Sequence, residues 1–526
     1  MGDMILYRSG GGSSIGYPPE NVTDFSLKAK SESVDLLWSD PDDITLSDGT
    51  VVKWAYTRIV RKTGSYPTNE NDGTIVVQSS VRNQYQTNPY TDTGLTNGTT
   101  YYYAAFACSD DEIFNEEVVT ASGTPMPYKV MTVIIDESNS NPATCCSYAD
   151  DAVTMPSGKG SDAVSAWQKF FGYRPCLFKD GQVIGYLNPD DYSKFEDGTN
   201  ADITSGNSGD VMVEFPRMGV RISKSGTKVT VSMTDDPDDS SFTYYAHTRG
   251  SSKCKNFYLG AYLCQNSFVS DKKIRSLSGQ PIYHAWNNST YFKTEDVITY
   301  CHALGDGYEP MTFYQWTFLQ CMYLLEFKNL KVSDAIGYAW THDYNSESYP
   351  PTGGTDQCGL VYGTTNSSTD KNLLRRKIFG IEDLASIAVN NCYGLYMKKD
   401  TNGDALIYAR TDDLGNLTDE SGFKLVGREV RNVVSSSKYG YITKTVGSSE
   451  YGFLPENPYS TLIGSSTTYY TCYAQMGPGG GFSEISSSEY NIVTMQTGAS
   501  CQSGGGGMFR CWGGEVHKAF RVSYYK

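Results

Sequence analysis

Hydrophobic and polar positions alternate with a period of two over residues 22–127, which is the pattern of half-buried β-strands. Residues 34–38 fit a strand with a buried Trp38, and residues 54–61 alternate most clearly. Residues 95–106 carry a further strand after a turn. Because turn residues separate these runs, the pattern predicts a set of short strands in this part of the chain.

The same period continues in short runs farther along the chain. Residues 210–216 alternate and end at a proline, and residues 220–233 predict a hairpin around Ser225 and Gly226. Residues 179–181 predict a turn between two strands. Further strands are expected over residues 130–135, 176–178, 183–187, 256–263, 393–397 and 405–408, with a two-residue turn at 402–403 before the last of them.

Three segments change to the helical period of 3.6. Residues 161–171 predict a short helix with Ser161 or Asp162 as its N-cap. Residues 294–304 predict a second helix that begins at a threonine cap and ends at glycines, and residues 313–327 predict a third. We expect the last two helices to form a scaffold behind a sheet.

Each of these two longer helices is predicted to bury one face. Val297, Cys301 and Leu304 form the apolar stripe of the first. The corresponding face of the second consists of Trp316, Leu319, Gln320, Tyr323, Leu324 and Phe327.

The C-terminal end departs from both patterns. Residues 477–514 hold eleven glycines and six serines around a few aromatic rings. Gly and Ser permit irregular backbone while aromatic rings supply contact area at low entropic cost, which is the composition of loop-built recognition surfaces. Residues 519–526 predict a closing strand. A segment held at both ends favours a display surface over a disordered Gly/Ser tail, and residues 467–514 are called the display segment below.

Composition supports a β-rich or mixed architecture with large ordered loops. The 526 residues include 41 Tyr and 52 Gly, and only 19% are charged. This length is enough for about three or four domains. The formal charge of -16 gives no electrostatic reason to bind nucleic acid or an anionic membrane.

Residues 1–20 are predicted to be a flexible docking arm or linker, because glycine and serine dominate residues 9–16. They contain no apolar stretch of the length that a signal peptide needs. No apolar run elsewhere reaches the roughly 18 residues of a transmembrane helix. The sequence therefore predicts neither signal-peptide secretion nor membrane insertion.

The 13 cysteines do not form a metal-binding pattern. No two of them have C-x-x-C spacing, and with only five histidines no zinc spacing is present. We expect most of them to be reduced, buried apolar residues of a protein made in a cytoplasm. A disulfide between Cys501 and Cys511 across the glycine-rich residues remains an alternative.

The residues give no pattern for catalysis. Asp and Glu are too scattered to nominate the carboxylate pair of a glycosidase, and no nucleophile elbow, P-loop or HExxH helix is present. Residues 400–404 imitate the start of a calcium loop, but Ala405 stands where glycine is needed and Thr411 where glutamate is needed. The sequence predicts no enzyme, no cofactor and no metal site.

Residues 21–127 resemble a fibronectin type III domain. Trp38 matches the core tryptophan of the second strand, and Leu95 with Tyr101 matches the leucine and tyrosine of the tyrosine corner. The resemblance implies a β-sandwich that serves as a spacer, with Trp38 and Tyr101 as packing residues.

Residues 210–526 resemble the C-type lectin-like fold of bacteriophage tail and receptor-binding proteins, which is related to that of formylglycine-generating enzymes. The resemblance rests on several phrases in the right order, among them Gly-Ile-Glu-Asp-Leu at residues 380–384. The other phrases are residues 210–216, 257–262, 276–279 and 315–327, and the run at 520–524 that follows the glycine-rich end. Residues 128–209 resemble the connecting region that precedes this fold in similar phage proteins.

The two resemblances imply a β-rich α+β protein, in which a fibronectin III sandwich precedes a lectin-like fold with two helices packed on antiparallel sheets. They imply a non-catalytic adhesin of a phage tail tip or fibre, made in the host cytoplasm and located in the virion. Its expected partners are a bacterial surface protein or glycan and, through the N-terminal region, other tail proteins. Such fibres are commonly homo-oligomers, and some relatives diversify this surface with a retroelement.

The ligand-binding residues expected on the display segment are rings and polar groups, namely Tyr469, Tyr470, Tyr473, Phe482, Glu484, Tyr490, Asn491, Phe509 and Trp512. Two alternatives stay open. In the first, the glycine-rich end of a structural virion protein docks a neighbouring subunit. In the second, Cys501 and Cys511 are the cysteine pair of a formylglycine-generating-type oxidase, with Arg510 and, more distantly, His517 as the groups that could lower a thiol pKa.

Overall fold

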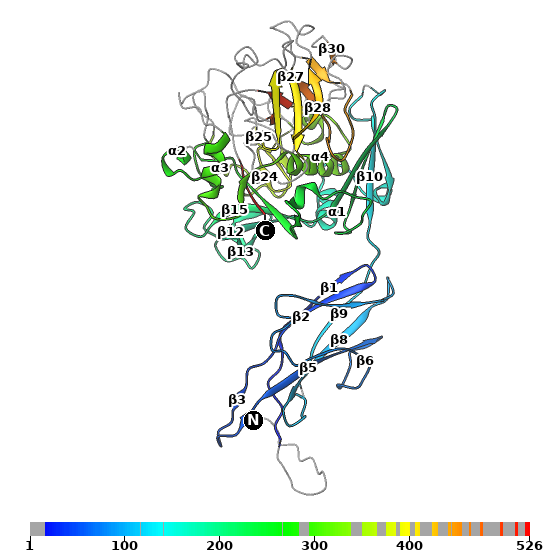
Figure 1. The fold of residues 1–526 in the computed structure, drawn as a ribbon, viewed down its shortest axis with the longest axis vertical. Helices are drawn as coiled ribbons and strands as arrows, with labels where there is room; N and C mark the ends of the chain where they lie inside the picture. Colours follow the sequence, from blue (N-terminus) through cyan, green and yellow to red (C-terminus); the bar gives the residue numbers. More distant parts are fainter. Residues whose placement is uncertain are drawn as a thin grey trace. The chain divides into compact units, whose positions relative to one another are not determined.

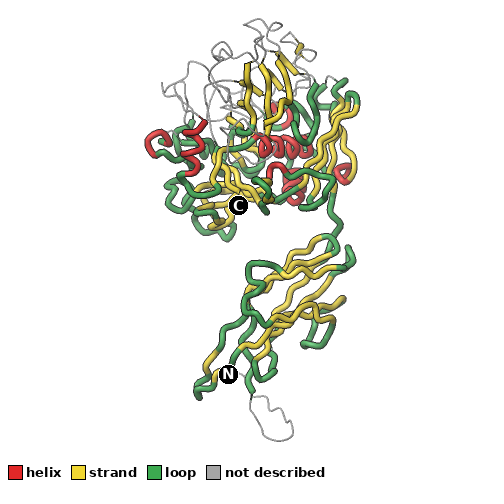
Figure 2. The backbone as a smooth tube through the Cα atoms, in the orientation of Figure 1, coloured by secondary structure: helices red, strands yellow, loops and turns green. Residues whose placement is uncertain are grey.

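A computed structural model describes the chain in segments. The residues described are 16–115, 117–139, 141–265, 267–282, 294–337, 350–364, 375–384, 390–399, 405–410, 423–429, 440–442, 444–454, 462–463, 474–476, 495–497, 511–513 and 521–525. The chain divides into two compact units, Met1–Tyr128 and Lys129–Lys526. Figure 2 shows that the described helices all belong to the second unit.

The first unit consists of short antiparallel strands. Their bounds are β1 (Thr23–Lys30), β2 (Ser33–Ser39), β3 (Ile44–Thr45), β4 (Val51–Val52), β5 (Trp54–Thr63), β6 (Thr74–Ser79), β7 (Tyr90–Thr93), β8 (Tyr101–Ser109) and β9 (Val119–Gly123). One sheet has the order β1-β2-β7 and another the order β6-β5-β8-β9, while β3 and β4 form a separate pair. The strands predicted for this region are confirmed.

The residues singled out in this unit are core residues. Trp38 is 1% exposed and Leu95 3%, and both belong to one apolar core. The indole nitrogen of Trp38 donates a hydrogen bond to Asp40 at 2.9 Å. The hydroxyl of Tyr101 accepts a hydrogen bond from the backbone nitrogen of Thr96 at 3.0 Å. Both polar tips are therefore satisfied while the rings are packed.

The second unit combines several antiparallel sheets with a few helices (Figure 1). Its helices are η1 (Asp151–Thr154), α1 (Ser161–Phe171), η2 (Tyr245–His247), α2 (Phe268–Asp271), α3 (Thr294–His302), α4 (Phe313–Phe327) and α5 (Val332–Ala335). Its strands before α3 are β10 (Val130–Asp136), β11 (Cys146–Asp150), β12 (Arg174–Lys179), β13 (Gln182–Asn188), β14 (Asp191–Phe195), β15 (Asp210–Pro216), β16 (Gly219–Ser225), β17 (Lys228–Thr234), β18 (Thr248–Arg249), β19 (Ser252–Lys253) and β20 (Asn256–Gly260). Those after α3 are β21 (Tyr308–Pro310), β22 (Tyr362–Gly363), β23 (Arg376–Ile378), β24 (Ile381–Glu382), β25 (Asn390–Cys392), β26 (Leu395–Lys399), β27 (Ala405–Arg410), β28 (Phe423–Glu429), β29 (Gly440–Ile442), β30 (Leu462–Ile463), β31 (Ala474–Met476), β32 (Met495–Thr497), β33 (Cys511–Gly513) and β34 (Val522–Tyr525).

The largest sheet has the order β14-β13-β12-β15-β20-β34-β21. Strand β34 comes last in the chain, yet it lies inside this sheet: Phe257 stands opposite Tyr525 on one side, and Tyr308 stands opposite Tyr524 on the other. Residues 128–209, expected as a connecting region, supply β12, β13 and β14 to the same sheet. The connecting region and the predicted lectin-like region are thus parts of one structure.

The turn predicted at residues 179–181 joins β12 to β13. Asp180 and Gly181 both adopt left-handed backbone conformations, with φ of 50° and 79°, as tight hairpins require. A Cβ atom on Gly181 would lie 2.5 Å from the hydroxyl oxygen of Tyr524. Glycine at this position therefore also lets β34 approach the hairpin.

The prediction that Ser161 or Asp162 caps α1 is wrong. Gly160 is the N-cap, with extended backbone and no side-chain cap bond, and both predicted residues already lie inside the helix. Asp162 in the first turn still stabilises the helix dipole. Trp167 is fully buried and Phe171 is 2% exposed, so packing of this face holds the helix in place.

Helix α4 has the predicted bounds, and Thr312 caps it in a capping box with Gln315. The prediction that it buries one face is wrong, because every residue from Phe313 to Phe327 is buried. Strands β10 and β17, helix α1 and η2 all contact it. A helix whose side chains are buried on every face lies in the middle of a core.

Helix α3 ends at His302 rather than at residue 304, in a turn that contains Gly305 with φ of 134°. Val297 and Cys301 of its predicted stripe are fully buried. Strands in antiparallel sheets dominate the described residues, so the prediction of a β-rich fold is confirmed at that level.

Candidate ligand-binding surface

Most of the expected contact residues lie outside the described residues. These are Tyr469, Tyr470, Tyr473, Phe482, Glu484, Tyr490, Asn491 and Phe509. Trp512 belongs to β33, where it pairs with Gln496 of β32. The calcium-like residues 400–404 and Cys501 also lie outside the described part of the chain.

Short strands within and before the display segment pair with one another. Strand β32 pairs with both β25 and β33, and β29 pairs with both β30 and β31. Cys392, at the end of β25, is fully buried, and the carbonyl of the next residue, Tyr393, accepts a hydrogen bond from the backbone nitrogen of Phe313 in α4 at 2.7 Å. Strands β32 and β33 of the display segment are therefore connected through β25 to the central helix, whereas β31 pairs with β29.

Residues 444–454 form the first anchor of the C-terminal part. The backbone nitrogen of Ile222 in β16 donates to the Ser449 hydroxyl at 2.8 Å. The Tyr314 hydroxyl of α4 donates to the carbonyl of Glu450 at 2.9 Å. These bonds fix the chain against β16 and α4 before it enters the display segment.

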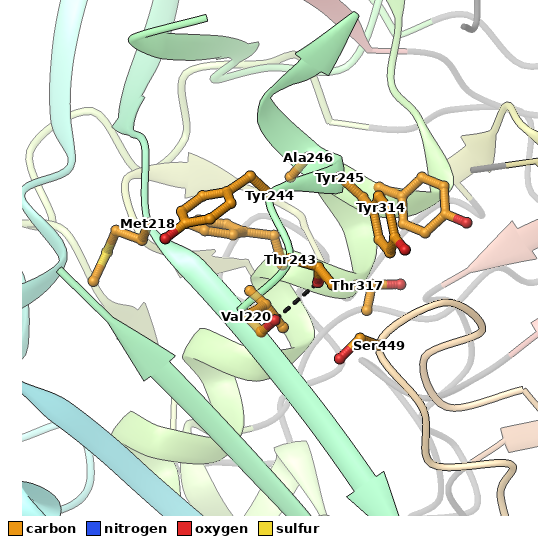
Figure 3. Close-up of a pocket in the computed structure, with 10 residues that line it drawn as sticks. Met218, Val220, Thr243, Tyr244, Tyr245, Ala246, Tyr314, Thr317 and Ser449 are labelled. Atoms are coloured by element: carbon orange, nitrogen blue, oxygen red, sulfur yellow. Dashed lines mark hydrogen bonds between the residues drawn. The ribbon is translucent and has the colours of Figure 1, made fainter. Parts of the chain in front are cut away.

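A small pocket lies next to this anchor (Figure 3). Tyr245 and Tyr314 line it, with ring centres 4.9 Å apart, together with Thr317 and Ser449. Its volume of about 10 Å³ holds at most about one water molecule. Because an organic ligand needs far more room, we assign this pocket to the packing of the anchor.

The second anchor is a buried ion cluster at residues 375–384. Glu382 is 1% exposed and accepts hydrogen bonds from the backbone nitrogens of Gly353 at 2.9 Å and Thr355 at 2.8 Å. The Arg375 guanidinium also donates to this carboxylate. Burial raises the pKa of Glu382, while the positive charge of Arg375 acts in the opposite direction. The partners offset part of the cost of burying the charge, and the pKa stays raised.

Lys377 lies in the same cluster and is 1% exposed. Its ammonium nitrogen is 3.5 Å from the ring centre of Tyr192 and donates to the carbonyl of Thr355 at 3.1 Å. Burial lowers the pKa of Lys377 to about 8, against the attraction of Asp356. A shifted pKa of this kind marks candidate functional groups. Since no ligand can reach so deeply buried an amine, we assign Lys377 a structural role.

The third anchor is β34 with the residue before it. Arg521 is 1% exposed, and its Nη1 donates to the carbonyl of Gly260 at 3.1 Å. Its Nη2 donates to the carbonyl of Glu382. Burial lowers the pKa of Arg521 to about 10. One side chain thus joins the start of β34 to β20 and to the ion cluster.

Sequence reasoning did not find these anchors. From the sequence, Glu382 was noted only as part of the phrase at residues 380–384, and Arg521 only as part of the last strand. The signal that was available is the run of charged residues at 375–377 beside the apolar pair Ile378 and Phe379. Cations next to a buried apolar run predict buried anionic partners, because Lys and Arg are rarely buried unless they are paired.

Comparisons with known proteins assign no family, since neither a family model nor a curated protein matches the chain. Among the residues described, no three metal-ligating side chains are grouped so as to hold an ion. In the same part of the chain, no helix combines the length and the apolar character needed to cross a membrane. Among the described cysteines, Cys108, Cys145, Cys146, Cys176, Cys254, Cys301, Cys321 and Cys358 are free thiols.

Proposed function

We propose that the protein is a non-catalytic adhesin of a phage virion, in which a fibronectin III-like domain precedes a C-type lectin-like fold. The display segment binds a bacterial surface receptor, a protein or a glycan, through its aromatic rings. The N-terminal region connects the protein to other tail proteins.

The observation that carries this proposal is the anchoring on either side of the display segment. Leu454 before it and Arg521 after it are each 1% exposed. Arg521 continues directly into β34 inside the largest sheet. Fixed ends allow the residues between them to change without disturbing the sheet, because loop-closure entropy grows only slowly with length. That tolerance suits a surface that has to match different receptors.

The strand arrangement of the first unit supports the fibronectin-like part. Its sheets β1-β2-β7 and β6-β5-β8-β9 have the two-sheet arrangement of such sandwiches. The Thr96 to Tyr101 hydrogen bond has the form of a tyrosine corner. For the second unit, the burial of Glu382 and Asp383 from the matched phrase supports the lectin-like part.

Binding of the labelled full chain to a panel of bacterial strains tests the proposal. The combined variant Phe482→Ser, Tyr490→Ser and Phe509→Ser removes three of the expected contact rings. We expect it to lose more than about tenfold in affinity for any strain that the wild type binds, because aromatic anchors dominate such interfaces.

A matched control changes an exposed ring elsewhere. Tyr66→Ser removes a tyrosine that is 40% exposed in the first unit, and we expect it to bind cells like the wild type. Unchanged binding by the triple variant would exclude the display segment as the receptor site. A triple variant that binds cells normally but no longer assembles into particles would favour the subunit-docking alternative.

A further inference from the structure

Cys145 and Cys146 are two neighbouring thiols at the end of the hairpin that joins β10 to β11. Their sulfur atoms lie 3.7 Å apart, although the side chains of consecutive residues in a strand point to opposite faces. Cys146 is the first residue of β11, whereas Cys145 lies in the turn before it. The turn therefore brings the two sulfurs together.

The pair lies close to the surface of the second unit. Cys145 is 4% exposed and Cys146 5%, whereas Cys301 and Cys321 are fully buried. The next residue along β11, Ser147, is exposed. Hydrogen peroxide has only two heavy atoms, so it needs little more room than water. This oxidant therefore reaches the pair more easily than it reaches the fully buried cysteines.

The contact between the sulfurs gives the two thiols different roles. The Cys145 thiol donates a hydrogen bond to the carbonyl of Pro142 at 3.5 Å, so the hydrogen between the sulfurs comes from Cys146. This bond lowers the pKa of Cys145, against the effect of burial, and raises the pKa of Cys146. Because the thiolate is the nucleophilic form of cysteine, Cys145 is the group that reacts first.

We propose that Cys145 and Cys146 form a reversible disulfide when the protein meets hydrogen peroxide. The Cys145 thiolate attacks one oxygen, the O–O bond breaks, and the leaving hydroxide takes up the proton that Cys145 released. Cys145 is then a sulfenic acid. The Cys146 sulfur attacks the Cys145 sulfur, the S–O bond breaks, and the hydroxyl leaves as water with the Cys146 proton. Two thiols are oxidised to one disulfide, and one peroxide is reduced to two waters.

The closed ring is strained and is therefore easily opened again. Consecutive Cα atoms are about 3.8 Å apart, whereas disulfides usually join Cα atoms that are about 4.4–6.8 Å apart. Strained disulfides are the labile ones in thiol–disulfide exchange. We therefore expect dithiothreitol to restore both thiols.

Ring closure acts on the edge of the sheet β11-β10-β17-β16. Cys146 pairs with Ile135, and the Cys145 carbonyl accepts a hydrogen bond from the backbone nitrogen of Asp136 at 2.8 Å. A ring between the two cysteines changes the backbone where β11 begins. This site goes beyond the proposed function and is independent of it, because its chemistry needs no receptor.

Peptide mass spectrometry of the full chain after treatment with hydrogen peroxide tests the proposal. The protein is alkylated in denaturant and cut with trypsin, which releases residues 130–159 with this cysteine pair and no further cysteine. The matched control is the peptide of residues 294–328, whose two cysteines, Cys301 and Cys321, are fully buried. We expect the first peptide to lose two hydrogen atoms and both alkyl groups, and the control peptide to be alkylated twice.

Two serine variants separate the roles of the thiols. Cys146→Ser removes the thiol that closes the ring, so we expect the Cys145 sulfenic acid to persist and to react with dimedone. Cys145→Ser removes the thiol that reacts first, so we expect no dimedone adduct. Serine is close to cysteine in size, and thermal melting checks that both variants fold like the wild type.

The proposal is overturned if the first peptide keeps both alkyl groups after peroxide, or if its cysteines gain oxygen as sulfinic acids. Oxidation of the control peptide to the same extent also overturns it, as does a failure of dithiothreitol to restore the thiols. A dimedone adduct in Cys145→Ser but not in Cys146→Ser overturns the assignment of Cys145 as the group that reacts first.

Discussion

The two compact units differ in how far apart in the sequence their paired strands lie. In the first unit, sheet partners come from neighbouring parts of a short region, as when Thr63 of β5 pairs with Tyr101 of β8. In the second unit, Phe257 pairs with Tyr525, and the whole display segment lies between them in the chain. The second core therefore depends on a strand that follows the most irregular part of the sequence.

Under the proposed function, this difference lets the display segment change without disturbing the core. Each doubling of a loop costs only about 0.6 kcal/mol in closure entropy, whereas the anchors on either side are buried in the core. Burial of Leu454 fixes the chain before the segment, and burial of Arg521 and of the β34 residues fixes the chain after it. Under the proposed function, the segment's composition then serves receptor binding. Among the described residues of the first unit, no comparable long segment is held between buried anchors.

The largest expected effect comes from removing β34. Deletion of residues 521–525 leaves β20 and β21 without their shared partner and exposes the apolar surface that Val522 and Tyr524 cover. We expect the second unit to lose its cooperative unfolding transition while the first unit keeps its own. Scanning calorimetry of the full chain measures both, and a second transition that survives the deletion would contradict the role assigned to β34.

The next effect comes from the ion cluster. We expect Arg375→Ala to destabilise the second unit by about 3–5 kcal/mol, because removing one partner leaves buried Glu382 uncompensated. Urea unfolding measures the loss. The control is Lys424→Ala, which breaks a pair with Glu450 whose lysine is 62% exposed and should leave the midpoint almost unchanged. Equal effects of the two variants would show that the cluster is not an anchor.

A pH-dependent effect should also separate the units. Glu326 in α4 is fully buried, neither carboxyl oxygen has a partner among the described residues, and burial raises its pKa well above the usual value. A raised folded-state pKa means that stability is lost as pH rises above the unfolded pKa of about 4.3, by at most about 1.4 kcal/mol per pH unit.

Glu326→Gln removes this titration, so we expect it to match or exceed the wild type in stability and to gain most at neutral and alkaline pH. Unfolding of the second unit across a pH series measures this. Glu196→Gln, at a glutamate that is 48% exposed, should follow the wild-type profile. A Glu326→Gln profile parallel to the wild type would show that this carboxyl does not titrate on unfolding.

The smallest effect concerns the link between α4 and β34. Thr312 caps α4, and its Oγ1 also lies 3.1 Å from the Tyr525 hydroxyl. Thr312→Ala should cost about 1 kcal/mol, whereas Thr312→Ser keeps the hydroxyl and should cost less. Thermal melting of the second unit distinguishes the two, and a serine variant as unstable as the alanine variant would point to lost methyl packing instead.

Local sequence predicted much of the fold. The period-two runs located β2, β5 and β8 in the first unit and β15 in the second, because alternation reflects the two faces of a strand. The turn at Asp180 and Gly181 and the bounds of α4 were also predicted, because a turn or a cap depends on a few adjacent residues. The candidate contact residues were chosen by composition, and their placement lies outside the described residues apart from the strand position of Trp512.

The sequence by itself therefore determined the type of elements such as β2, β5, β15 and α4, and the composition of the display segment. The tertiary structure decided what those elements join: that α4 is buried all round, that residues 128–209 share a sheet with β34, and that Arg375, Glu382 and Arg521 meet. The pattern of hydrophobic and polar residues shows which face of an element is buried. It does not show which distant strand covers that face, because this depends on burial and pairing across the whole unit.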